Sequence, residues 1–212
     1  MQGSRIVVVM ALLAAGAVCT AQAQPPQSSS APRRAGPAVT SADVRFMQEM
    51  LGHHQQAVEM VALLRTRTRS PTMRMLAERI EVSQTDEMAM MRRWLAERGA
   101  AGGGAGGHNW MTSHDTASHA GHAMPADSGN TVMPGMLTPG QMRALASTRG
   151  AAFDRLFLTG MIRHHEGALA MVAALQATPG AAQESSINHF VIEVDTDQRA
   201  EIARMRRMLN TK

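Results

Sequence analysis

One segment of this chain occurs twice, and this repeat restricts the possible folds more than any other feature. Residues 43–62 read DVRFMQEMLGHHQQAVEMVA and residues 154–173 read DRLFLTGMIRHHEGALAMVA, at a constant offset of 111. Duplicated helical hairpins produce repeated amphipathic segments of this kind. Packing alone does not require a repeated His-His pair with Met on either side. The repeat therefore predicts a duplicated helical domain that presents imidazole and thioether side chains.

The segments that follow the two motifs are also repeated, at an offset of 114. Their matching residues share one helical face: Ile80, Gln84, Glu87, Met88, Met91 and Leu95 correspond in order to Val194, Gln198, Glu201, Ile202, Met205 and Leu209. The periodicity predicts long helices over about 42–66, 71–98, 151–176 and 181–209, and a short helix over about 139–147. We expect an all-α fold, a four-helix bundle of ferritin-like or up-down type built from two duplicated hairpins.

The first 23 residues have the pattern of a secretory signal peptide. Arg5 precedes an apolar run, and small residues predict cleavage after Ala23. The rest divides into a disordered tether over 24–40, a first helical hairpin over 41–98, a Gly-, His- and Met-rich linker over 99–137 and a second helical hairpin over 138–212. We expect a periplasmic or secreted protein with no membrane span after signal removal.

Cysteine usage limits the chemistry of such an exported chain. Cys19 is the single cysteine, and lipidation at this residue is an alternative to cleavage after Ala23. Cleavage after Ala23 leaves no cysteine, which excludes disulfides, thiolate metal sites and cysteine nucleophiles. The net charge of +4 comes with few aromatic residues, 3% of the chain, so nucleic acid is not an expected partner.

The two motifs place soft and borderline metal ligands on one side of a helix. Met50 lies one turn from His53 and His54, and the second motif repeats this arrangement. Thioethers and imidazoles together suit copper, as Cu(I) or Cu(II), whereas zinc has little use for Met. Adjacent helical residues lie about 100° apart, so one histidine of each pair is expected to face the core. The helical phase favours His54 and His165 for that position.

The linker between the hairpins contains further candidate ligands. A Gly-rich spacer does not need histidine or methionine, and His-rich tracts are typical of metal binding. We expect residues 99–137 to form no packed core and to be disordered without a ligand. The secondary candidate ligands are His108, Met111, His114, His119, His122 and Met124, and Met133 and Met136 follow them.

Two other interpretations remain open at this stage. A Met or His on a helical face most often serves packing, so the chain could be a structural or partner-binding bundle without metal. Ferritin-like bundles can also be metal-dependent oxidoreductases, but the di-iron motif needs a Glu three residues before His, and neither His pair has one. Neither repeat shows a nucleophile triad or a phosphate-binding loop, so we do not expect an enzyme.

The doubled motif, followed in each half by Q-x-x-E-[MI]-x-x-M, resembles the domain of unknown function 305 family. The similarity covers about residues 41–98 and 138–210. It implies a ferritin-like fold, and some exported members of that family bind copper and support copper tolerance. By this resemblance the candidate metal ligands are Met50, His53, His54, Met60, Met161, His164, His165 and Met171.

The sequence therefore predicts an exported protein that buffers, carries or sequesters copper. Its expected partners are the metal ion and either a copper-delivery protein or a second copy of the chain. The stoichiometry, the affinity and the oxidation state of the bound metal do not follow from the residues.

Overall fold

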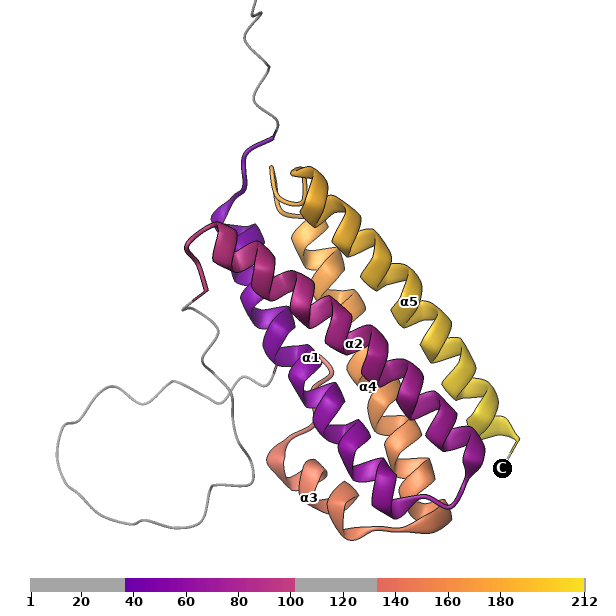
Figure 1. Cartoon of the computed structure of the whole chain (residues 1–212). Coiled ribbons are helices and arrows are strands. Elements are labelled where there is room, and N and C mark those ends of the chain that lie inside the picture. The colour runs from indigo at the N-terminus through magenta and orange to yellow at the C-terminus, as the bar shows by residue number, and fades with distance from the viewer. Residues whose placement is uncertain (1–36, 102–132, 212) are drawn as a thin grey trace, which may run out of the picture. The chain divides into compact units, whose positions relative to one another are not determined.

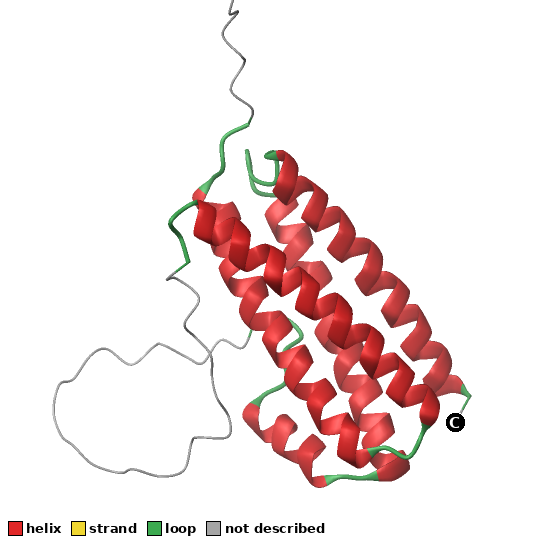
Figure 2. Cartoon of the chain, viewed as in Figure 1, coloured by secondary structure: helices red, strands yellow, loops and turns green. Residues whose placement is uncertain are grey.

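The computed structural model describes residues 37–101 and 133–211, and every regular element in these ranges is a helix (Figures 1 and 2). The elements are α1 (Ser41–Arg67), α2 (Pro71–Glu97), α3 (Pro139–Ser147), α4 (Gly150–Gln176) and α5 (Ser185–Asn210). This confirms the predicted all-α class, and four of the five helices begin within one residue of the predicted start. None of the described helices is long and apolar enough to cross a membrane.

Side-chain caps fix where the helices begin. The Thr40 hydroxyl accepts a hydrogen bond from the Asp43 backbone N–H, and the Asp43 carboxylate accepts one from the Thr40 backbone N–H. This reciprocal capping box satisfies two backbone donors that a helix end leaves unpaired. Ser70 caps α2 in front of Pro71, and Thr138 forms a second capping box with Gln141.

The start of α5 differs from the prediction by four residues. Ala182 adopts a left-handed conformation, with φ 55°, and its N–H donates to Asp43 Oδ1 at 2.7 Å. Glu184 then caps α5 by accepting hydrogen bonds from Ser186 and Ile187. The bond to Asp43 joins residues 139 positions apart in sequence, so local periodicity could not reveal it.

Each hairpin pairs two antiparallel helices, and the hairpins meet along α1 and α4 (Figure 1). The first half of α1 packs with the second half of α4, so these two helices are also antiparallel. It follows that α2 and α4 run in the same direction. A four-helix bundle with this arrangement needs one long crossover connection, as in ferritin-like folds.

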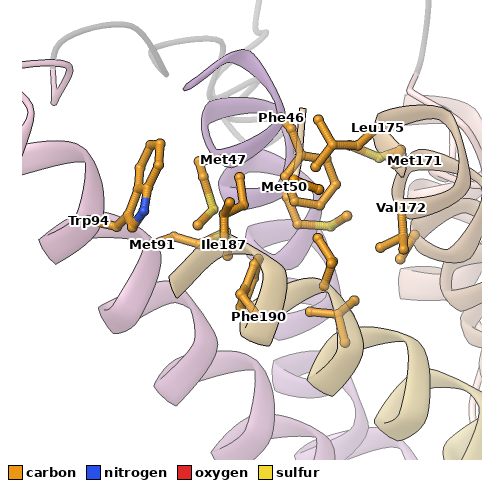
Figure 3. Packing of buried hydrophobic residues seen from close by; sticks show 14 of the residues in the cluster. Phe46, Met47, Met50, Met91, Trp94, Met171, Val172, Leu175, Ile187 and Phe190 are labelled. Atoms are coloured by element: carbon orange, nitrogen blue, oxygen red, sulfur yellow. The ribbon is translucent and has the colours of Figure 1, made fainter. Parts of the chain in front are cut away.

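Two apolar clusters form the core, one toward each end of the bundle. The first apolar cluster includes Phe46, Met47, Met50, Met91, Trp94, Met171, Leu175, Ile187 and Phe190 (Figure 3). The second apolar cluster includes Met60, Leu64, Met73, Ile80, Phe153, Phe157, Met161 and Met205. Burial of each such side chain contributes about 1.5–3 kcal/mol, so these clusters supply most of the stability of the bundle.

A polar layer separates the two apolar clusters. It consists of His53, His54, Gln84, Glu87, His164, His165, Gln198 and Glu201, all buried except Glu87, which is partly exposed. Each half of the repeat supplies four residues of this layer: two histidines from the motif, and one Gln and one Glu from the long helix that completes the hairpin. A buried polar atom without a partner costs about 1–3 kcal/mol, so an apolar layer here would be more stable. Positions that break the core pattern in this way are expected to serve function.

Candidate metal centre

His53 of α1 and His164 of α4 stack at the middle of the bundle. Their ring centroids lie 3.8 Å apart, with 38° between the ring planes. Burial, and after it the neighbouring His54, lower the pKa of His53 to about 3. Burial and then the proximity of His53 hold the pKa of His164 well below its ordinary value. Both central imidazoles are therefore neutral near pH 7 and can offer a nitrogen lone pair.

The second histidine of each pair faces a carboxylate on the other helix of its own hairpin. His54 Nε2 lies 2.5 Å from Glu87 Oε2, and His165 Nε2 lies 2.5 Å from Glu201 Oε2. A carboxylate accepts such a bond, so Nε2 is the donor. Nδ1 of each ring is buried and has no hydrogen-bond partner in the part of the chain that the structure describes.

His53 shows the same division between its two ring nitrogens. His53 Nε2 lies 2.9 Å from the Pro134 carbonyl oxygen, and His53 Nδ1 has no partner among the described residues. His164 Nε2 is likewise buried without a partner in residues 37–101 and 133–211. Three of the four imidazoles thus have one nitrogen held by an oxygen, and all four have one buried nitrogen that is available to a ligand.

The carboxylates connect this layer to solvent. Glu87 and Glu201 line a groove between α2 and α5 with a volume of about 1030 Å³. Asp197 lies in the same groove, and burial together with the charges of Glu87 and Glu201 raises its pKa. Ser83 of the first half corresponds to Asp197 of the second half. The Ser83 hydroxyl donates a hydrogen bond to Glu87 Oε1 at 3.1 Å.

The predicted thioether ligands lie above and below the histidines. Met50 and Met171 belong to the first apolar cluster, and Met60 and Met161 belong to the second. At a rise of about 1.5 Å per residue, Met50 and Met161 lie one helical turn from the rings, whereas Met60 and Met171 lie about two turns away. Met50 and Met161 are therefore the thioethers best placed to share an ion with the imidazoles.

Nitrogen and oxygen ligands alone do not complete a site in this geometry. Within residues 37–101 and 133–211, no three His, Asp or Glu side chains are arranged to hold one ion. Two of the four unpartnered imidazole nitrogens belong to α1 and two belong to α4. The sulfur atoms of the methionines on either side of the histidines are the remaining soft donors. These donors suit a soft metal ion that binds imidazole and thioether ligands together.

The family model described as domain of unknown function (DUF305) matches residues 43–209, which include both repeated motifs and both helical hairpins. The chain belongs to the DUF305 family. A search of curated proteins gives no significant match.

Solved structures of DUF305 proteins share this fold. A DUF305 fragment from Deinococcus radiodurans is 28% identical, with a TM-score of 0.61, over 83% of this chain and 100% of that one. A DUF305 protein from Streptomyces coelicolor, named as secreted, is 27% identical, with a TM-score of 0.64, over 81% of this chain and 93% of that one. CopM in its Cu(I)-bound form is 23% identical, with a TM-score of 0.53, over 80% of this chain and 96% of that one. That last likeness shows the fold alone.

Both histidines of each pair are buried in this DUF305 chain. Helical phase favoured His54 and His165 as the core-facing members, and these two turn toward α2 and α5. His53 and His164 stack against each other where α1 meets α4, and all four rings are buried. Because α1 and α4 each pack against two long helices, each has room for two buried histidines.

Other predicted features fall outside the described part of the DUF305 chain. The signal peptide over 1–23, most of the tether over 24–40 and the secondary candidate ligands of the linker belong to these residues. The last five residues of the predicted linker are described, and they pack against the bundle. The prediction that residues 99–137 are disordered without a ligand is therefore wrong for residues 133–137. A Pro-Gly pair between two methionines was the available signal.

The neutral central histidines predict a pH dependence of stability in the metal-free protein. The pKa of His53 is about 3 when folded and 6.5 when unfolded, so between these values the unfolded chain binds more protons. The contribution of His53 to the free energy of unfolding is therefore fully present above pH 6.5 and is lost as the pH falls toward 3. We expect His53 to account for about 2 kcal/mol of lost unfolding free energy between pH 7 and pH 5, and His164 to add to this loss.

Urea denaturation at the two pH values measures this effect. His53→Gln should reduce the loss, whereas His189→Gln, at a histidine whose side chain is 74% exposed, should not change it. An equal loss in wild type and His53→Gln would show that His53 is not buried in its neutral form.

Proposed function

We propose that this DUF305 protein is an exported copper-binding protein that buffers, carries or sequesters copper as cargo. The observation that carries the proposal is the division of nitrogens in the polar layer. Metal-bound histidine almost always donates its second ring N–H to a carboxylate or a backbone carbonyl, which orients the free nitrogen toward the ion. Three of the four buried imidazoles, those of His53, His54 and His165, have such a partner in Pro134, Glu87 and Glu201.

The choice of metal follows from the donors. Neutral imidazole and thioether ligands favour copper over the hard cations, and Met contributes little to zinc binding. CopM, which shares the fold, has been solved in Cu(I)-bound, Cu(II)-bound and Ag-bound forms. We propose the ligand set Met50, His53, His54, Met60, Met161, His164, His165 and Met171, with Met50 and Met161 contributing more than Met60 and Met171.

A purely structural bundle accounts less well for the polar layer. Six polar atoms of this layer lack a hydrogen-bond partner among the described residues: His53 Nδ1, His54 Nδ1, Gln84 Nε2, His164 Nε2, His165 Nδ1 and Gln198 Oε1. Each costs about 1–3 kcal/mol, and an apolar core would avoid that cost. A bound ion recovers part of this free energy at the imidazole nitrogens, so the layer is explained by a ligand. We propose no catalytic residues.

Competition titration tests the proposal directly. The protein without its signal peptide should bind Cu(I) at least about 100-fold more tightly than Zn(II), because thioethers discriminate between these ions. The double variant Met50→Leu with Met161→Leu should lose most of this preference and keep its helix content, since Leu and Met have similar volumes. Equal affinities for the two metals in wild type would remove the argument from methionine.

The linker residues form a second proposed site for copper. Replacing the His and Met residues of 102–132 with Ser should lower the number of bound ions and keep the bundle site, because the connection between the hairpins and every ligand of the polar layer remain. Export follows as part of the same proposal, since a chain without thiolates can hold copper in an oxidising compartment.

A further inference from the structure

The structure assigns residues 133–137 a role beyond that of a connection. We propose that this segment, the 133–137 loop, is a positioning element whose Pro134 carbonyl fixes the tautomer of His53 and so aims Nδ1 at the metal. This inference rests on the proposed function for the identity of the ligand. The tautomer itself is a property of the metal-free protein and can be measured without copper.

The contact between Pro134 and His53 permits one tautomer only. A carbonyl oxygen can accept a hydrogen bond but cannot donate one, so the proton lies on His53 Nε2, 2.9 Å away. A neutral imidazole carries a single N–H, and therefore Nδ1 holds a lone pair. That atom is buried and has no hydrogen-bond partner among residues 37–101 and 133–211. Without the carbonyl, nothing described near the ring would favour this tautomer over the other.

Side chains from α1 and α4 hold the 133–137 loop in place. Gln56 of α1 makes two hydrogen bonds to Leu137, donating to its carbonyl at 2.9 Å and accepting from its N–H at 2.7 Å. Arg163 of α4 donates to the Met136 carbonyl at 2.6 Å and to the Gly135 carbonyl at 3.4 Å. The loop is thus fixed to both helices that carry the central histidines.

Close backbone contact brings Pro134 within reach of the histidine. A Cβ atom on Gly167 would lie 1.9 Å from the Pro134 carbonyl oxygen, and one on Gly135 would lie 2.3 Å from the Arg163 carbonyl oxygen. Gly135 also has φ 76°, a left-handed conformation that favours glycine. Only glycine at both positions allows the loop to lie directly on α4.

The two halves of the repeat diverge where they touch this loop. Gly167, which makes room for Pro134, corresponds to Gln56, which anchors Leu137. Arg163, which anchors the loop carbonyls, corresponds to Gly52, beside which the methyl group of Met133 packs. The histidines, in contrast, are the same in both halves. The sequence differences between the two halves therefore allow a single loop to pack against both α1 and α4, although the histidines of the site are duplicated.

Met133 gives the loop a thioether next to the site. It is partly buried and packs against the first apolar cluster, which contains Met50 and Met171. Gly52, its neighbour on α1, directly precedes His53. The 133–137 loop consequently brings a backbone acceptor and a soft donor to the same side of the histidine layer.

Gly167→Ala is the variant that tests the proposal. Its Cβ cannot coexist with the Pro134 carbonyl in the observed position, so the loop must move away while α4 gains helix propensity. The matched control is Gly160→Ala in the same helix, where a Cβ would first meet the ends of the Leu137 and Met60 side chains, in ordinary contact at 3.4–3.5 Å, and not the backbone of the loop. Two-bond ¹H–¹⁵N correlation spectra of the metal-free proteins report the protonated nitrogen of His53, and Cu(I) competition reports affinity.

We expect His53 to carry its proton on Nε2 in wild type and Gly160→Ala, and to populate both tautomers in Gly167→Ala. Cu(I) affinity should fall about tenfold or more in Gly167→Ala alone, as is usual when the partner of a metal ligand is lost. An unchanged tautomer with unchanged affinity would overturn the proposal, as would a mixed tautomer with unchanged affinity. If Gly167→Ala does not fold, the double variant Gln56→Ala with Arg163→Ala releases the loop and is measured in the same way.

Failure of copper binding can be told apart from failure of this inference. If wild type does not bind Cu(I), the proposed function is wrong. A single His53 tautomer in wild type that is lost in Gly167→Ala would then still establish the loop as the element that positions His53. A mixed tautomer in wild type would refute the inference whatever the affinity for copper.

Discussion

Replacing both His53 and His164 with Gln is expected to weaken Cu(I) binding by about 100-fold or more, roughly 1.4 kcal/mol for each tenfold change. Gln keeps a polar group of similar volume but is a poor copper ligand. Its amide can still donate to the Pro134 carbonyl in place of His53 Nε2. The free energy of unfolding of the metal-free double variant should therefore lie within about 1–2 kcal/mol of the wild-type value.

The structural interpretation predicts the reverse pattern. If the stacked rings only fill the core, the double variant should lose several kcal/mol of unfolding free energy and bind copper as wild type does. His189→Gln is the control for unspecific effects, because the His189 side chain is exposed on the surface of α5. Affinity by competition with a Cu(I) chelator and stability by urea denaturation decide between the two interpretations.

Loss of the carboxylate partners is expected to have the second largest effect. Glu201→Ala removes the acceptor for His165 Nε2 and leaves a buried N–H without a partner, which costs about 1–3 kcal/mol of stability. Cu(I) affinity should fall about 10- to 100-fold, because the ring loses both its orientation and the electron donation of the carboxylate. Glu201→Gln should recover most of the stability and only part of the affinity, since the amide accepts the hydrogen bond without the charge.

Glu193→Gln provides the matched control for this series. Glu193 also lies on α5, lines the same groove and pairs with a histidine at 3.0 Å, but that histidine is His189. Its replacement should change neither stability nor copper affinity. If Glu193→Gln and Glu201→Gln weaken Cu(I) binding equally, the effect comes from the general charge of the groove and not from the bond to His165.

The helices of this protein could be predicted from sequence because periodicity and capping residues agree. Thr138 before Pro139 and Ser70 before Pro71 mark helix starts locally, and the two offsets reveal the duplicated hairpins. Glu87 and Glu201 were recognised as duplicated carboxylates on inward faces. Their pairing with His54 and His165 needed the structure, because spacing within a helix does not tell which neighbouring helix a side chain faces.

The remaining features depend on contacts that leave no periodic signal. The start of α5 depends on Ala182 and its bond to Asp43, far away in sequence. The 133–137 loop follows a Gly- and His-rich segment, and its composition predicts a flexible connection. Its order comes from Gln56, Arg163 and the space above Gly167, none of which is near it in the chain.

The position of the 133–137 loop also bears on why the two hairpins belong to one chain. Gly52 and Gln56 on α1 are the internal-symmetry mates of Arg163 and Gly167 on α4, so the loop lies across the approximate two-fold axis that relates the hairpins. A homodimer of a single hairpin would carry two such loops, and both would need the same space. It would also have to present identical side chains on the two sides of the axis. Joining the copies covalently removes both restrictions, because one loop can then bind two surfaces that have become different.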